Sequence, residues 1–236
     1  MSESVVIDER FHGPAASANG GYACALVARP IGGPAEVTLR VPPPLSRALR
    51  IEHEDDRVLM LDGEVLVAEA RPVSLDLEVP APVSMAQAER AAAAYPWRTT
   101  HPYPTCFVCG PQREAGDGLC IFPGPVEDRP LFAAPWIPDA GLSEADGSVA
   151  AEFVWAALDC PSGIVTDLFG DVGVILLGRL AVDIRGSVTA GEPHVVQAWT
   201  LARDGRKLGT ASALFTAAGD LLAVARAVWI ELRPQA

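Results

Sequence analysis

The sequence predicts an α+β fold made of two similar halves, and three observations lead to this prediction. Each half starts with a strand-like run, continues with a helix signal and ends in several strand-like runs separated by turns. Short segments at corresponding places in the two halves resemble each other, and an alanine-rich segment with helix signals lies between them. A meander of strands buries one face and needs a helix or a second sheet to cover it, which a duplicated unit supplies.

The first half contains one helix signal between strand-like runs. Residues 3–11 begin as a strand, and 12–14 interrupt it. Asn19 is a good N-cap, and Tyr22, Leu26 and Arg29 recur at helical spacing before Pro30 and the Gly32-Gly33 pair end the helix. Four strand-like runs follow, separated in part by Asp-Asp and Asp-Gly turns: roughly 36–41, 49–53, 58–61 and 65–77.

The segment between the halves has a clear helix start and stop. Ser84 to Gln87 has the capping-box pattern, and Tyr95-Pro96 ends the alanine-rich run that follows. We therefore expect a first unit at 1–82, a linker helix within 83–98 and a second unit at 99–236. Short strands are expected at 119–122 and 131–136 in a region rich in Pro, Gly and Cys.

The second half repeats the order of the first. Residues 149–158 are strand-like, and Asp159 with Pro161 two residues later is typical of a helix start that runs to about Phe169. Residues 63–71 resemble 219–226 with one residue of slippage, and 37–40 resemble 180–183. The remaining strands are expected at 180–185, 195–203, 207–216 and 221–232.

Composition limits the partners and the compartment. The formal net charge of −12 disfavours nucleic acid and anionic lipid as partners. The longest apolar stretch, 172–177, is far shorter than the roughly 20 residues of a membrane span. No basic segment followed by an apolar one is visible at the N-terminus, so we expect a cytoplasmic protein whose five cysteines are reduced.

Two local motifs and the order of elements resemble the hotdog fold, in which a curved antiparallel sheet wraps one central helix. Asn19-Gly20-Gly21 lies where hotdog thioesterases often carry His-Gly-Gly at the start of that helix. Cys106 to Gly110, followed by Gly118-Leu119, resembles the Cys-x-x-Cys-Gly…Gly-Leu segment of some acyl-CoA thioesterases. The resemblance implies two tandem hotdog units joined by a linker helix.

The same resemblance implies an acyl thioester ligand, bound between the two units and carried by coenzyme A or by a carrier protein. Hydrolysis is the activity we expect, without a cofactor; an acyl-CoA hydratase or dehydratase and a non-catalytic acyl-ligand binding protein are the alternatives. Free N–H groups at a helix N-terminus can hold the thioester carbonyl while a carboxylate acts as base or nucleophile. The resemblance is also compatible with a homodimer of such chains.

The candidate site residues follow from placing that chemistry on this sequence. Hotdog thioesterases with His-Gly-Gly usually have an acid two turns further along the helix, but residues 22–28 contain none. We therefore expect Asp167 to act with Asn19 and Gly21, while Asp159 and Asp171 remain alternatives for the acid. Residues expected to contact the ligand are His12, Gly20, Tyr22, Asp159, Ser162 and Gly163.

Each of these assignments has a purely structural alternative. Residues 19–21 can be a helix cap with a tight turn, Asp159 an N-cap and Asp167 a solvated surface aspartate. His12, before Gly-Pro, can be a loop residue with a local hydrogen bond. Cys106 and Cys109 form a lone Cys-x-x-Cys, and a zinc site would need further ligands from His101, Cys120 or Cys160. Because the spacing matches no zinc ribbon and no thioredoxin-like motif, we expect a structural turn and no metal.

Overall fold

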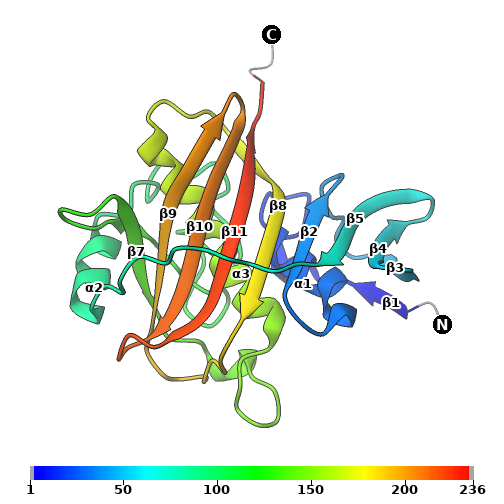
Figure 1. The fold of residues 1–236 in the computed structure, drawn as a ribbon, viewed down its shortest axis with the longest axis horizontal. Coiled ribbons are helices and arrows are strands. Elements are labelled where there is room, and N and C mark those ends of the chain that lie inside the picture. Colours follow the sequence, from blue (N-terminus) through cyan, green and yellow to red (C-terminus); the bar gives the residue numbers. More distant parts are fainter. Residues whose placement is uncertain (1–2, 234–236) are drawn as a thin grey trace.

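The computed structural model describes residues 3–233, and within that range the strands form an 11-stranded antiparallel sheet (Figure 1). Its order across the sheet is β1 (Glu3–Val6), β3 (Ala48–Glu54), β4 (Arg57–Asp62), β5 (Val65–Pro72), β2 (Ala35–Leu39), β8 (Ile175–Ile184), β11 (Leu221–Glu231), β10 (Lys207–Thr216), β9 (His194–Asp204), β7 (Leu131–Trp136) and β6 (Gly124–Pro125). The first five strands in this order make the N-terminal half-sheet, and the other six make the C-terminal half-sheet.

The half-sheets join where β2 pairs with β8, and the register of this pairing is symmetric. Val37 lies opposite Leu180, while Glu36 lies opposite Ala181 and Thr38 opposite Arg179. The internal resemblance of the sequence matches Val37 with Leu180 as well. The two strands aligned as repeats are therefore the two that pair, with a local twofold relation centred on Val37 and Leu180.

Two helices cover the inner face of the sheet and pack against each other: α1 (Gly20–Ala28) and α3 (Ala151–Ile164). Residues 21–28 of α1 and 153–164 of α3 are all buried, as expected for helices that are apolar on every side. The expected cap of α1 is confirmed, because the Asn19 side chain accepts from the N–H of Tyr22. A 3-10 turn at Arg29–Ile31 and Gly32, at φ +69°, end this helix region.

The expected strand at 149–158 is wrong, because α3 starts at Ala151 and continues through it. A run that is apolar on every side has neither a helical nor a strand period, so the pattern cannot separate the two structures. Pro161 lies inside the helix rather than in its first turn, where it removes one N–H from the ladder. Asp159 is therefore a helix-interior residue and not an N-cap, and the chain continues into a 3-10 helix at Val165–Phe169.

The other expected elements agree with the structure to different degrees. β7 and β10 match in their bounds, whereas β5 ends at Pro72 and β1 at Val6, earlier than expected. Residues 119–122 form no strand. The capping box is confirmed at the start of α2 (Met85–Ala93), where Ser84 and Gln87 bond to each other's backbone N–H groups. None of the helices in the described range combines the length and the apolar character of a membrane span.

The outer face of the C-terminal half-sheet is covered by the chain that leaves β5. Figure 1 shows this chain crossing in front of β8, β11, β10 and β9 to reach α2, with α3 behind the strands. Leu75 and Val83 of the crossing segment, residues 73–83, join a second apolar core on that face. Buried Gln197 of β9 fixes the segment, because it donates to the carbonyl of Pro80 (2.8 Å) and accepts from the N–H of Val83 (3.2 Å).

Candidate functional site

A cavity of about 810 Å³ opens beside the N-terminus of α1, a volume within the usual range of small-molecule sites. Its lining comes from both parts of the chain: residues within 13–20, 39–43, 97–109, 159–167, 172–178 and 229–232. Most of these side chains are apolar, and the polar ones include Asn19 and Asp159 at the two helices. The arrangement suits a ligand with a long apolar part and one polar reacting group.

Asp159 of α3 is the buried carboxylate of this cavity, with 1% of its surface exposed. Its Oδ2 accepts from the backbone N–H of Gly21 (2.8 Å) and from the side-chain amide of Asn19 (3.1 Å). Both donors come from the first turn of α1 or its cap. The start of one helix is thus bonded to a carboxylate on the other.

Asn19 can serve both helices because its amide has an acceptor and a donor. The cap requires Oδ1 to accept from the N–H of Tyr22, at 3.0 Å, which turns Nδ2 toward α3. There Nδ2 donates to Asp159 and, at 3.5 Å, to the Cys160 sulfur. An Asp at this position would cap α1 equally well, but its ionised carboxylate would have no proton to donate to α3.

The second oxygen of Asp159, Oδ1, is buried and has no hydrogen-bond partner among the described residues. A buried acceptor without a hydrogen-bond partner lowers the stability of the fold by about 1–3 kcal/mol, and such groups are therefore rare in folded proteins. Burial raises the pKa of Asp159 to about 7, against the opposing effect of the hydrogen bonds from Gly21 and Asn19. Asp159 therefore lines the cavity with one carboxylate oxygen bonded to α1 and the other without a protein partner among the described residues.

The two glycines at the start of α1 have different neighbours. A Cβ on Gly21 would lie 2.6 Å from the Asp159 Cβ and 2.7 Å from the Trp155 carbonyl, so this glycine allows the helices to approach each other. Gly20 lines the cavity, and its N–H belongs to the first turn, where no intrahelical acceptor exists. Of the two, Gly20 is the residue whose N–H can meet a ligand, because the N–H of Gly21 is bonded to Asp159.

Asp167 also lines the cavity, but its hydrogen bonds lead away from α1. It lies in the 3-10 helix after α3, and both carboxylate oxygens accept from the Trp97 indole N–H, at 3.1 and 3.3 Å. Burial raises its pKa, and the Trp97 bond opposes that shift. The expected contact between Asp167 and the Asn19–Gly21 turn is not among the hydrogen bonds of the structure, which places Asp159 there instead.

Five of the expected site residues lie outside the cavity lining, and Gly21 is one of them. Tyr22 stacks on Phe11, with ring centroids 4.3 Å apart, in an aromatic cluster that also contains Phe107 and Phe153. His12 contacts the nearby Glu9 carbonyl and, from a distant part of the chain, the Thr105 hydroxyl. The remaining two are Ser162, whose hydroxyl donates to the Asp159 carbonyl, and exposed Asp171. Gly163 does line the cavity, where a Cβ would lie 2.7 Å from the Trp229 ring.

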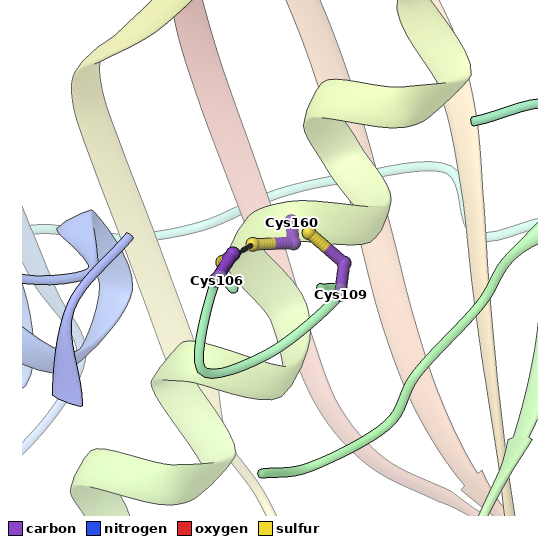
Figure 2. A group of neighbouring side chains, drawn as sticks. All are labelled: Cys106, Cys109 and Cys160. Atoms are coloured by element: carbon purple, nitrogen blue, oxygen red, sulfur yellow. Dashed lines mark hydrogen bonds between the residues drawn. The ribbon is translucent and has the colours of Figure 1, made fainter. Parts of the chain in front are cut away.

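A second group of side chains at the same cavity was not expected from the spacing of the sequence. The sulfurs of Cys106, Cys109 and Cys160 all lie within 4.8 Å of one another, and all three residues are buried. Figure 2 shows the loop that carries Cys106 and Cys109 next to α3, which carries Cys160. His101 is also buried here, with Nε2 3.2 Å from the Cys109 sulfur. Only the Cys-x-x-Cys pair was a visible signal, because Cys160 lies 54 residues beyond Cys106.

Comparison with known proteins identifies the fold. No protein-family model and no curated protein matches the sequence. Among solved structures, the tesB protein of Mycobacterium avium subsp. paratuberculosis has 13% identity and a TM-score of 0.63, covering 98% of this chain and 93% of that one. A proposed thioesterase from Novosphingobium aromaticivorans has 12% identity and a TM-score of 0.64 (98% and 96%). A hotdog-fold protein of unknown function from Alicyclobacillus acidocaldarius has 10% identity and a TM-score of 0.56 (99% and 94%). The chain therefore has the hotdog fold.

Proposed function

We propose that this protein hydrolyses acyl thioesters in the cavity beside α1 and α3. In this proposal each half-sheet with its helix is one hotdog unit, α2 belongs to the link between the units, and the site lies where they meet. The symmetric β2–β8 register and the packing of α1 on α3 support the tandem arrangement. The structural likeness to proteins described as thioesterases supports the chemistry.

One observation carries the assignment of the reacting group: the buried, partly unbonded carboxylate of Asp159. Oδ2 is held by Gly21 and Asn19, so the orientation of the carboxyl group is fixed and Oδ1 stays free. A water bonded to Oδ1 attacks the thioester carbonyl carbon and gives its proton to Asp159. The C–S bond then breaks, and the proton passes to the leaving thiolate, which yields a carboxylic acid and a free thiol.

Charge develops on the carbonyl oxygen during that attack, and a donor must stabilise it. Gly20 lines the same cavity at the N-terminus of α1, and its N–H is the donor we assign to this role. The apolar walls formed by residues such as Leu39, Ile175 and Leu177 hold the acyl chain. The thioester is presented on coenzyme A or on a carrier protein.

The test compares two aspartates of the same cavity. We expect Asp159→Asn to lower kcat by about 100-fold or more, as for removal of a general base, with little change in KM. Asp167→Asn is the matched control, and we expect it to stay within a few-fold of the wild type, because Trp97 occupies its carboxylate. Steady-state hydrolysis of acyl-CoAs of graded chain length, and of the same acyl groups on a carrier protein, measures both.

Stability separates a catalytic from a structural role of Asp159. Asn has nearly the same shape and keeps an acceptor for the N–H of Gly21, so the thermal midpoint of Asp159→Asn should remain within a few degrees of the wild type. A large loss of stability, or full activity in Asp159→Asn with loss in Asp167→Asn, contradicts the assignment. If no thioester is hydrolysed while a long-chain acyl-CoA still raises the thermal midpoint, the protein is an acyl-ligand binding protein.

A further inference from the structure

The cluster of Cys106, Cys109 and Cys160 has the dimensions of a metal site. All three sulfurs lie within 4.8 Å of one another, and those of Cys106 and Cys160 are 3.7 Å apart. In tetrahedral coordination with metal–sulfur bonds of about 2.3 Å, neighbouring sulfurs are separated by about 3.8 Å. The sulfurs therefore already lie close to the positions that one tetrahedral ion requires.

The loop that carries two of these sulfurs is shaped so that both face α3. The N–H of Gly110 donates to the Cys106 carbonyl at 3.0 Å and closes a tight turn around the pair. A Cβ on Gly110 would lie 2.5 Å from the Cys106 nitrogen and 2.6 Å from the Pro104 carbonyl, so the turn admits only glycine. Figure 2 shows Cys160 on the neighbouring helix, facing this loop.

Two of the three sulfurs of the cluster have an N–H donor beside them. Asn19 donates to Cys160 at 3.5 Å, and His101 lies 3.2 Å from Cys109. Three buried thiols supply donors of their own, so two additional N–H donors fit sulfurs that act as acceptors. N–H donors around the sulfurs are the usual outer shell of a metal bound by thiolates.

The tautomer of His101 makes it a donor to the cluster rather than a ligand. Its Nδ1 accepts from the backbone N–H of Tyr103 at 2.8 Å, so the hydrogen of the neutral ring is on Nε2 and points to Cys109. Within the described chain, the potential ligands that share the 4.8 Å sphere are the three cysteines and no fourth residue. All three cysteines line the cavity, so the remaining position opens toward it.

We propose that Cys106, Cys109 and Cys160 bind one zinc ion as thiolates, with the fourth position open to a water or another ligand from the cavity. Soft sulfur ligands in tetrahedral geometry select zinc over harder divalent ions. Binding releases the thiol protons to solvent, and no electron transfer is required. Three protein ligands with an open position are the arrangement of a reactive rather than a closed structural zinc site. This site is independent of whether the protein hydrolyses thioesters.

Metal content of the full chain, purified with a reductant, tests the proposal directly. We expect one zinc per chain by elemental analysis, lost in Cys109→Ser and in Cys160→Ser. Cys24→Ser and Cys120→Ser are matched controls, because these cysteines lie outside the cluster, and we expect both to keep the metal. Zinc retained in Cys160→Ser, or lost equally in Cys24→Ser, overturns the assignment.

Two measurements keep the proposal testable if the cysteine variants do not fold. Wild-type protein reconstituted with cobalt should show the near-ultraviolet charge-transfer absorption of three cobalt–thiolate bonds. His101→Phe should still bind one zinc but about 10–100-fold more weakly, as for loss of an outer-shell donor. Failure of reduced wild-type protein to bind zinc or cobalt, or a Cys106–Cys160 disulfide in the protein as purified, refutes the site.

Discussion

The two helices that meet under the sheet occupy corresponding places in the two halves, yet they carry opposite parts of the candidate site. α1 has nine residues, begins at the Asn19 cap and contains no carboxylate. α3 has 14 residues, begins without a side-chain cap and holds Asp159 in its interior. The N–H donors on one helix meet the carboxylate on the other. Two helices at corresponding places in the chain can therefore carry different and complementary groups.

The outer faces of the two half-sheets differ as well. Residues 73–83 and α2 bury the outer face of the C-terminal half-sheet, so β9 is apolar on both sides. Within residues 3–233, no corresponding segment covers the outer face of the N-terminal half-sheet, which carries charged residues instead. Glu69 pairs there with Arg40 and Arg57, and Glu36 pairs with Arg179 and Arg226 across the junction. Apolar burial stabilises one face, and ion pairs between largely buried glutamates and more exposed arginines occupy the other.

The contact between the helices should be the most sensitive to change. In Gly21→Ala the added methyl would lie 2.6 Å from the Asp159 Cβ, so α1 and α3 must separate. We expect a loss of about 3 kcal/mol, at the upper end of overpacking costs, and a thermal midpoint lower by roughly 6–12 °C. Gly33→Ala is the control, because no atom lies within 4 Å of its added methyl. Equal midpoints for the two variants would show that the helices do not pack this closely.

The covered face should respond next most strongly. Gln197→Leu removes two hydrogen bonds and leaves the Val83 N–H and the Pro80 carbonyl without partners, so we expect a cost of about 1–3 kcal/mol. Hydrogen exchange should accelerate in residues 73–83, where the segment is released. Exposed Gln112→Leu serves as control and should change neither quantity. Unchanged exchange in 73–83 would mean that apolar contacts alone hold the segment.

The uncovered face should give the smallest effect and a dependence on pH. Glu69→Gln should cost less than about 1 kcal/mol at pH 7, and salt should reduce the difference further. The hydrogen bond from Arg40 lowers the pKa of Glu69 in the folded protein, so its contribution is present above its ordinary pKa of 4.5. That contribution is lost as the pH falls through the lowered pKa. Denaturant unfolding of both proteins from pH 7 to pH 3 measures it; a gap that widens on acidification contradicts the pairing.

Local signals in the sequence predicted most of the fold but not the start of the second helix. The Asn19 cap, the Ser84–Gln87 capping box and the Asp-Gly turns depend on neighbouring residues, and the structure has helix starts and hairpins there. Residues 153–158 of the expected strand are buried on every side, so their pattern fits a helix and a strand equally. Pro161 then favoured a later helix start, although in the structure the helix accommodates it.

The candidate site was only partly predictable, because long-range packing creates it. Asn19 and Gly20 were found through the helix-start signal, and both line the cavity. Asp159 was found as a polar residue near a helix, but its burial depends on its contact with α1. Asn19, the cap of α1, and Asp159 are 140 residues apart in the chain. Nothing in the spacing of Cys106 and Cys109 indicates that Cys160 joins them. Such convergence is a property of tertiary structure rather than of local pattern.

The complete burial of α1 has a consequence for how the chain is made. Residues 21–28 leave the ribosome before α3 exists, and the α3 residues that contact Gly21 are Trp155, Ala156 and Asp159. At about 5–20 residues per second, synthesis needs on the order of 10 s to reach them. During that interval one side of α1 is apolar and uncovered. The edge of β2 that later pairs with β8 is also unpaired. The nascent N-terminal half is therefore a natural client for chaperones until the rest of the chain arrives.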